Sequence, residues 1–293
     1  MSSEVQSSTM ATIVNYIKWS ATRPRARLVP GPWLPPALTY SDIEFKSEFS
    51  DKTNLSGWLI KERNTASRGV VILCHGHLGN RLEMLSIACM LSKHHFTTLC
   101  FDFRARGKSA GSMCTLGLRE AFDVMGAVSY VRQNPETSNL PVFVLGNSMG
   151  GASAIRAAYR DKRIDAVICE ACFARLTNVV SARIRLTTGP FASKLIEQCH
   201  SVDGTRNDNG FSIDEVNPVD EIAAISPRPV LLITDGADAT CPRNESDSLY
   251  AAALEPKSRW IAPMTPHVQA FRLHPAEYTG ICVEFLEAAL IRV

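Results

Sequence analysis

A serine lies between glycines at the end of an apolar run. Residues 142–155 read VFVLGNSMGGASAI, so a strand-like stretch stops at Gly146, offers Ser148 and resumes with helical spacing after Gly150. The pattern G-x-S-x-G between a buried strand and a helix is typical of the nucleophile elbow, a tight turn that exposes a serine hydroxyl. It is equally typical of a glycine-rich packing turn. Because a serine hydroxyl is a weak nucleophile by itself, the choice depends on a base and an orienting acid elsewhere in the chain.

Two histidines and two aspartates could supply the base and the acid. His267 follows the strand-like stretch SRWIAPM, whereas His274 opens the last predicted helix and is interpreted as a surface or capping residue. Asp235 and Asp238 both follow the run VLLIT, in the chain order Ser…Asp…His that this kind of site uses. We prefer Asp238, since it lies farther into the loop, while Asp235 is placed to begin a turn. Asp238 would orient the imidazole of His267 while that ring takes the serine proton.

Backbone amides for a developing oxyanion can come from two places. One is the N–H of Met149, directly after the serine, and the other is the N–H of His77 in the glycine-containing stretch LCHGHLGN. The alternative interpretation of His75 and His77 is a zinc pair, but a third ligand at suitable spacing is missing. The two glycines of this stretch favour an unusual backbone path.

Strand-like and helix-like segments alternate in a way that can position these residues. Residues 38–62 alternate as two strands around a polar turn. The repeated units that follow predict an α/β fold with a mostly parallel, doubly wound sheet flanked by helices. Residues 174–226 interrupt the rhythm and are interpreted as a short helical cap insertion. The expected organisation is an N-terminal arm over 1–39 and one domain over 40–293. The expected strands lie near 68–76, 96–103, 140–147, 164–173, 227–236 and 258–264, and the expected helices near 81–95, 116–133, 149–160, 244–254 and 276–290.

Five stretches in this order resemble the α/β-hydrolase superfamily, in the branch of small serine esterases and acyl-peptidase-like domains. They are CHGHLGN, FDFRARGKSAG, GNSMGG, PRPVLLITDGADATCP and TPHVQAFRLHPAEY. The chain departs from the usual pattern at Ala105, where a glycine is common, at Pro266 before the histidine, and at Thr234-Asp235. The spacing from Asp238 to Pro242 matches the family.

The resemblance implies a serine hydrolase that cleaves a carboxylic ester of a small acyl substrate through an acyl-enzyme intermediate, without metal or cofactor. Ser148, His267 and Asp238 would form the triad, with the amides of Met149 and His77 as the oxyanion hole. Thioesters, amides or peptides and carbon–carbon bonds are alternatives that the fold does not separate. A second class of function is a non-catalytic protein that binds a ligand or a partner.

Substrate selection is expected to reside in the insertion. Its side chains combine apolar and basic character, which suggests an acyl pocket with a basic rim suited to a carboxylate-bearing substrate. The alternative is that the arginines form a solvated helix face. The residues proposed to contact substrate are Phe173, Phe191, Arg183 and Arg185.

The composition of the chain limits the classes of function and location that remain. The chain has 293 residues, is 45% hydrophobic and carries a formal charge of +2, which gives no case for nucleic-acid binding. No run approaches the length of an apolar membrane span. The nine cysteines include several inside strand-like runs, which predicts reduced thiols and a cytoplasmic location. The lone pair Cys169 and Cys172 is weak evidence for a metal, and the oligomeric state cannot be read.

Overall fold

The computed structural model describes residues 22–26, 28–188 and 211–292, and most strands of this part form one sheet. This 8-stranded sheet has the order β10-β9-β8-β7-β4-β5-β3-β2. The edge strand β2 is antiparallel to β3, and β3 is antiparallel to β5, while all the other pairs are parallel. The predicted mostly parallel α/β sheet is therefore confirmed. The strands are β2 (Leu38–Lys46), β3 (Asn54–Glu62), β4 (Val70–Cys74), β5 (Thr97–Phe101), β7 (Val142–Asn147), β8 (Ala166–Glu170), β9 (Val230–Asp235) and β10 (Lys257–Ala262).

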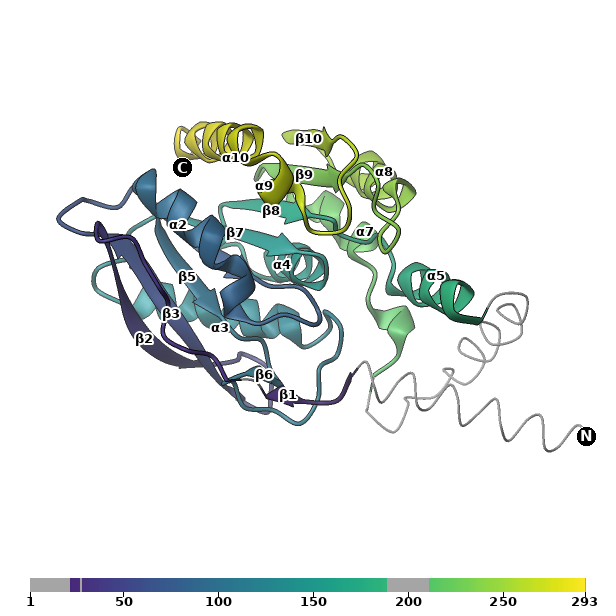
Figure 1. Cartoon of the computed structure of the whole chain (residues 1–293), viewed down its shortest axis with the longest axis horizontal. Coiled ribbons are helices and arrows are strands. Elements are labelled where there is room, and N and C mark those ends of the chain that lie inside the picture. The colour runs from purple at the N-terminus through teal and green to yellow at the C-terminus, as the bar shows by residue number, and fades with distance from the viewer. Residues whose placement is uncertain (1–21, 27, 189–210, 293) are drawn as a thin grey trace, which may run out of the picture.

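Helices cover both faces of this sheet (Figure 1). Each face has its own apolar cluster, and every residue of the central strands β4 and β7 is buried between them. A strand buried on both faces needs continuous apolar residues, which explains the unbroken runs in the sequence. One face carries α3 (Glu120–Gln133), α4 (Met149–Arg160) and α8 (Arg243–Ala252); the other carries the 3-10 helix η1 (Arg81–Met84), α2 (Leu85–Lys93) and α10 (Pro275–Leu290).

The predicted helix over 116–133 was wrong at its start. Leu116 and Gly117 both have positive φ, at 58° and 114°, so the chain cannot be helical there. The helix α3 begins instead at Glu120, whose carboxylate accepts hydrogen bonds from the amides of Thr115 and Gly117. The buried Glu120 therefore stabilises a turn at residues where the apolar spacing had predicted a helix.

The residues predicted as an insertion contain short helices that pack back on the domain. α5 (Leu176–Thr188) leads out of the sheet, and η3 (Ile213–Glu215), α7 (Pro218–Glu221) and η4 (Ile222–Ile225) lead back. Ile222 and Ile225 are buried in the same apolar cluster as α4. The later part of the insertion thus belongs to the packed body, and residues 189–210 lie outside the described part.

The N-terminal segment pairs with a loop near the carboxyl edge of the sheet. β1 (Arg25–Ala26) forms a 2-stranded parallel sheet with β6 (Arg106–Gly107). The guanidinium of Arg106 also donates to the carbonyl oxygen of Arg23, 3.1 Å away. Among the described residues, no helix combines the length and apolar character needed to cross a membrane. The cysteines in this part of the chain are free thiols.

Candidate active site

Ser148 occupies a strained turn between β7 and α4. Its backbone has φ 53° and ψ −116°, a conformation that non-glycine residues adopt only when the surroundings enforce it. The Ser148 amide donates to the carbonyl of Glu170 on β8 at 2.8 Å, and the Ser148 carbonyl accepts from the Ala152 amide at 3.1 Å. The neighbouring strand and the first turn of α4 therefore hold the strained residue from both sides.

The glycines beside Ser148 are required by close backbone packing. A Cβ added at Gly150 would lie 2.1 Å from the carbonyl oxygen of Cys74, and one at Gly146 would lie 2.3 Å from the backbone of Gly150. Such contacts are with backbone atoms and cannot be relieved by a side-chain rotation. The glycines are thus required by the packing of the turn that also carries Ser148.

His267 and Asp238 lie next to Ser148 in the order that proton transfer needs. The Nε2 atom of His267 is 3.0 Å from Ser148 Oγ, and its Nδ1 atom is 2.6 Å from Asp238 Oδ2. Asp238 Oδ1 accepts from the amides of Thr240 at 2.7 Å and Cys241 at 2.9 Å, so the carboxylate is fixed on both oxygens. An imidazole that donates from Nδ1 presents its Nε2 lone pair to the hydroxyl.

The two competing residues lie around the same loop without contacting Ser148. Asp235 accepts a hydrogen bond from the amide of Val268 at 2.5 Å. The Nε2 atom of His274 lies 3.1 Å from the carbonyl oxygen of Pro263 and 3.0 Å from Thr265 Oγ1. Both side chains support the backbone of the loop that carries His267, the residue that was predicted as the base.

A pair of buried carboxyl groups lies under this loop. Glu170 accepts from the amide of Ala270 at 3.1 Å, beside the Asp235 contact with Val268. Val268 has φ 56°, so these two acids support a stretch in an unfavourable conformation. Burial and the charge of Asp235 raise the pKa of Glu170 to about 8. Burial likewise raises the pKa of Asp235 to about 7.

His75 is a structural residue. Its Nε2 atom accepts from the amide of Phe103 at 3.1 Å, and its Nδ1 atom lies 2.7 Å from the carbonyl oxygen of Gly76. Burial lowers the pKa of His75 to about 3, so the ring is neutral. Both ring nitrogens are engaged with backbone, which excludes the zinc-pair interpretation for this side chain.

The loop that carries His77 is held by two charged side chains. Glu83 accepts from the Gly76 amide at 3.0 Å, and Arg106 donates from Nε to the His77 carbonyl oxygen at 2.8 Å. Burial raises the pKa of Glu83. Because Arg106 also binds the carbonyl of Arg23, the N-terminal segment and the His77 loop share one guanidinium.

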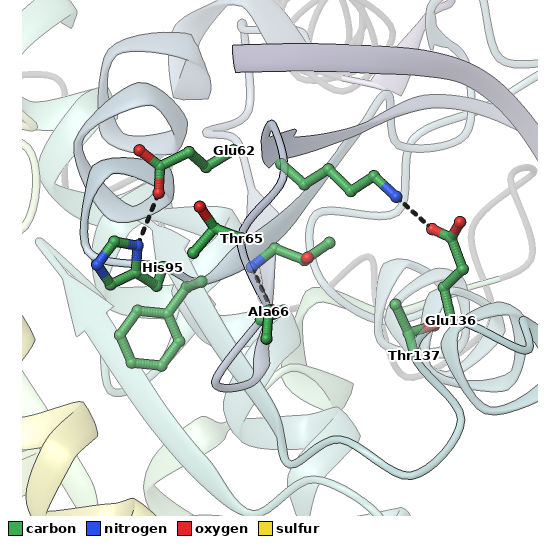
Figure 2. Close-up of a pocket in the computed structure, with 10 residues that line it drawn as sticks. Glu62, Thr65, Ala66, His95, Glu136 and Thr137 are labelled. Carbon is green, nitrogen blue, oxygen red and sulfur yellow. Dashed lines mark hydrogen bonds and ion pairs between the residues drawn. The ribbon is translucent and has the colours of Figure 1, made fainter. Parts of the chain in front are cut away.

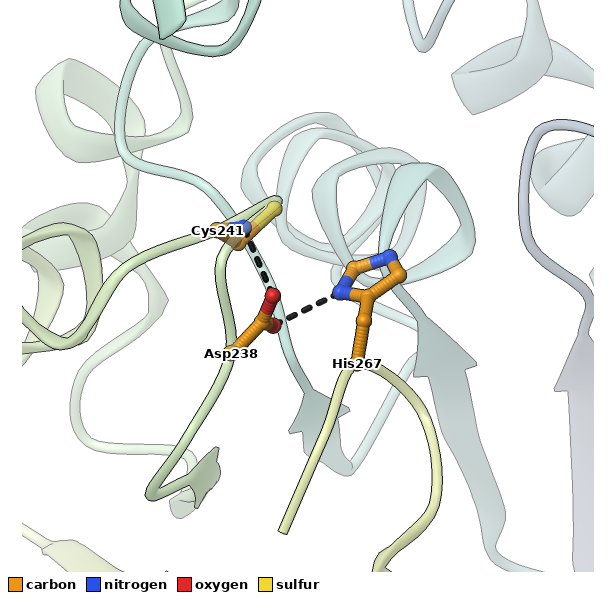
Figure 3. A group of neighbouring side chains, drawn as sticks. All are labelled: Asp238, Cys241 and His267. Carbon is orange, nitrogen blue, oxygen red and sulfur yellow. Dashed lines mark hydrogen bonds and ion pairs between the residues drawn. The ribbon is translucent and has the colours of Figure 1, made fainter. Parts of the chain in front are cut away.

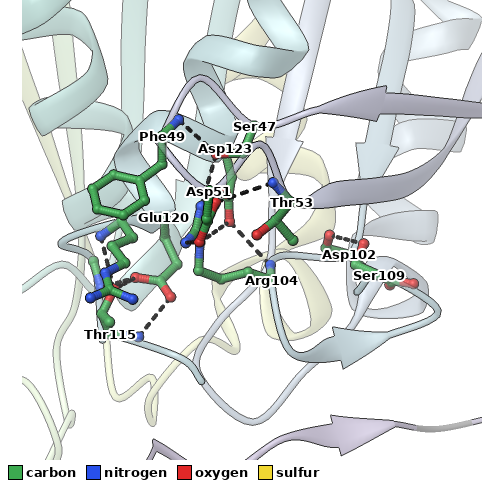
Figure 4. Close-up of polar contacts among 12 residues, drawn as sticks. Ser47, Phe49, Asp51, Thr53, Asp102, Arg104, Ser109, Thr115, Glu120 and Asp123 are labelled. Atoms are coloured by element: carbon green, nitrogen blue, oxygen red, sulfur yellow. Dashed lines mark hydrogen bonds and ion pairs between the residues drawn. The ribbon is translucent and has the colours of Figure 1, made fainter. Parts of the chain in front are cut away.

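The FDFRARGKSAG loop is fixed by a buried ionic network (Figure 4). The guanidinium of Arg104 lies 2.7 Å from the Asp123 carboxylate and 2.9 Å from Asp51. Ala105 has φ 56°, which explains why glycine is the more common residue at this position of the motif. A Cβ at Gly107 would lie 2.2 Å from the Asp102 carboxylate, so that glycine is needed.

The residues predicted to contact substrate are only partly described. Phe173 is buried in the same apolar cluster as Met149, and Arg183 is exposed on α5. The side chain of Arg185 and all of Phe191 lie outside the described part. Arg175, another basic residue of this region, forms an ion pair with Asp220.

A polar hollow of about 200 Å³ lies away from Ser148 (Figure 2). It is lined by the ion pairs Lys61–Glu136 and Glu62–His95, together with residues near the amino ends of β4 and β5. Ser148 follows the carboxyl end of β7, which is parallel to β4. Ligands of such sheets bind at the carboxyl ends of the strands, so this hollow is not the candidate site.

Sequence reasoning missed four residues that contact the candidate site or its supports. Glu83 and Glu170 lie within the stretches expected as a helix and a strand, and Arg106 and Cys241 lie within two of the five motif stretches. None of them was singled out, although the thiol of Cys241 contacts Ser148. Among these residues, only Glu170 carries a sequence signal of its supporting role, because a charged residue at the end of a continuously apolar strand is unusual.

The fold and this arrangement of strand ends define an α/β-hydrolase. The chain matches the family described as serine aminopeptidase, S33, over residues 65–224, and it belongs to that family. It is 28% identical to the uncharacterized protein YfhR of Escherichia coli K12, over 89% of this chain and 84% of YfhR. Protein bem46 of Schizosaccharomyces pombe is 26% identical over 76% of this chain and 69% of its own length.

A solved structure has the same architecture. The Pyrococcus furiosus esterase Pf2001 superimposes with a TM-score of 0.72 at 26% sequence identity, covering 91% of this chain and 98% of the esterase. The predicted resemblance to the α/β-hydrolase superfamily is therefore confirmed, and the chain is a hydrolase of this fold.

Proposed function

We propose that this protein hydrolyses carboxylic esters of small acyl substrates, with Ser148 as nucleophile, His267 as general base and Asp238 as the orienting acid. The observation that carries the proposal is the 3.0 Å contact between His267 Nε2 and Ser148 Oγ on a strained turn. A strained nucleophile in contact with an oriented base is the arrangement that acyl transfer requires.

In the first half-reaction, Ser148 Oγ attacks the carbonyl carbon while its proton moves to His267 Nε2. The imidazolium is stabilised by Asp238 Oδ2, and it then donates the proton to the leaving alcohol. In the second half-reaction, water attacks the acyl-enzyme with His267 again as base. The products are the carboxylic acid and free Ser148.

The oxyanion of each tetrahedral intermediate would be bound by the amides of Met149 and His77. Met149 is the first residue of α4, so its amide has no intrahelical acceptor and points with the positive end of the helix dipole. His77 lies on the loop that Glu83 and Arg106 fix. Removing one such donor typically costs about a hundredfold or more in kcat.

Peptide hydrolysis is the alternative that the family description raises. An aminopeptidase must bind the ammonium group of its substrate, usually with an acidic side chain. The acids around this site already accept protein hydrogen bonds: Glu83 from Gly76, Glu170 from Ala270 and Glu245 from Ala174. Because these three acids already bind backbone amides, the site is better suited to an ester than to a substrate with an ammonium group. The acyl group of that ester would lie against apolar residues such as Phe173.

A matched substrate series tests the type of bond. We expect kcat/KM for p-nitrophenyl esters to exceed that for the matching thioesters and for aminoacyl p-nitroanilides. Comparing short and long acyl chains in each class of substrate shows the longest acyl group that the pocket accepts. Ser148→Ala should abolish all three activities, which excludes a contaminating enzyme. Preference for the aminoacyl anilides would replace the ester proposal with the peptidase alternative.

A further inference from the structure

Cys241 lies beside the candidate triad without taking part in the proposed hydrolysis (Figure 3). Its backbone amide holds Asp238, and its thiol contacts the hydroxyl of Ser148. Any residue except proline could supply the amide, so the hydrogen bond to Asp238 does not explain a thiol at this place.

The thiol, the imidazole and the carboxylate converge on one small volume. Cys241, His267 and Asp238 each offer a donor atom, and the three atoms all lie within 4.8 Å of one another. Cys241 and Asp238 are buried, while the His267 side chain is 27% exposed. A small cation can therefore approach along the imidazole edge and meet sulfur, nitrogen and oxygen together.

This donor set suits one class of metal ion. Zn²⁺ binds thiolate, imidazole and carboxylate in tetrahedral sites, with three protein ligands leaving the fourth position to water. Sulfur favours the softer ions Zn²⁺ and Cd²⁺ over Mg²⁺ and Ca²⁺, which prefer oxygen ligands. The three residues come from two neighbouring loops, after β9 and after β10, that the packed sheet already places together.

We propose that a soft divalent cation of the zinc class binds Cys241, His267 and Asp238 and reversibly blocks the hydrolase. On binding, the Cys241 thiol loses its proton to solvent as the sulfur–metal bond forms. His267 binds the metal through Nδ1, which faces Asp238, and the proton of Nδ1 moves to Nε2. The imidazole then cannot accept the proton of Ser148, so acylation stops. Inhibition rests on the proposed function of His267, whereas metal binding itself does not.

Binding is measured directly, independently of hydrolysis. Protein freed of metal with EDTA is titrated with CdCl₂, and the ultraviolet thiolate-to-cadmium charge-transfer band is recorded. We expect the band in the wild type and in Ser148→Ala. We also expect it in the matched control Cys89→Ala, which removes a half-buried cysteine on α2. It should be lost in Cys241→Ala and Cys241→Ser. Equal bands in the wild type and in both Cys241 variants, or no band in any, would overturn the site.

Inhibition is measured with ZnCl₂ on the best ester, and each variant is normalised to its own metal-free rate. We expect the zinc concentration for half-inhibition to rise by at least about tenfold in Cys241→Ala, because loss of even an outer partner of a metal ligand costs about 10–100-fold in affinity. Cys89→Ala should behave as the wild type, and EDTA should restore the rate. A band without inhibition would keep the site but refute its blocking role. Absence of ester hydrolysis in the metal-free wild type would refute the proposed function while leaving the cadmium result valid.

Discussion

Asp238→Asn is expected to lower kcat for ester hydrolysis by about ten-thousandfold, the scale seen when the acid of such a triad is replaced. The reason is the donor pattern around this carboxylate. Oδ1 accepts from the amides of Thr240 and Cys241, so an asparagine would keep its carbonyl oxygen there. Its NH₂ group would then face His267 Nδ1 and donate to it. The imidazole would carry its proton on Nε2, where it can no longer accept one from Ser148.

Asp235→Asn is the matched control. Its carboxylate accepts from the amide of Val268, and an asparagine carbonyl can do the same. We expect a much smaller effect on kcat, with thermal melts showing that both variants are folded. Comparable losses in the two variants, or near-normal turnover in Asp238→Asn, would contradict the assignment of Asp238.

Glu170→Gln is expected to stabilise the protein at alkaline pH and to change it little at acidic pH. Glu170 is fully buried beside Asp235, and its pKa is raised to about 8 from an ordinary value of 4.5. Between these values the folded state binds a proton that the unfolded state has released. Stability therefore falls as pH rises from about 4.5 to about 8, and the loss is complete above that range. By linkage, a pKa difference of about 3.5 corresponds to a loss of about 5 kcal/mol.

The measurement is the free energy of urea unfolding at several pH values from 5 to 9, in steps of about one unit. The glutamine carbonyl can still accept from the Ala270 amide, so the loop keeps its support while the titration is removed. Glu284→Gln is the control, because it makes the same change at an exposed position of α10. If the wild type and Glu170→Gln lose stability in parallel as pH rises, the buried acid is not the cause.

The sheet could be predicted because its central strands are buried on both faces. Such strands must be continuously apolar, and each is followed by a helix with apolar residues at helical spacing. Ser148, Asp238 and His267 could be proposed because residues after the strands of a parallel sheet gather at one edge. The geometry of this edge brings the three side chains within hydrogen-bond distance.

The supports of the site could not be predicted because they depend on tertiary burial. Glu83, Glu170 and Arg106 bind backbone amides and carbonyls that are distant in sequence, and no local pattern marks such contacts. The start of α3 was mistaken because a buried glutamate stabilises left-handed residues inside an apolar helical pattern. The contact of Cys241 with Ser148 likewise follows from how two loops pack.

Labelling with a fluorophosphonate reports directly on whether Ser148 is an activated nucleophile, because only an activated serine reacts with this probe. We expect stoichiometric labelling of the wild type on Ser148, located by peptide mass spectrometry. Ser148→Ala should not be labelled. Ser153→Ala, which removes another buried serine hydroxyl from α4, should be labelled as the wild type. An unlabelled wild type, or equal labelling of Ser148→Ala, would contradict the account and favour a protein that binds a ligand without cleaving it.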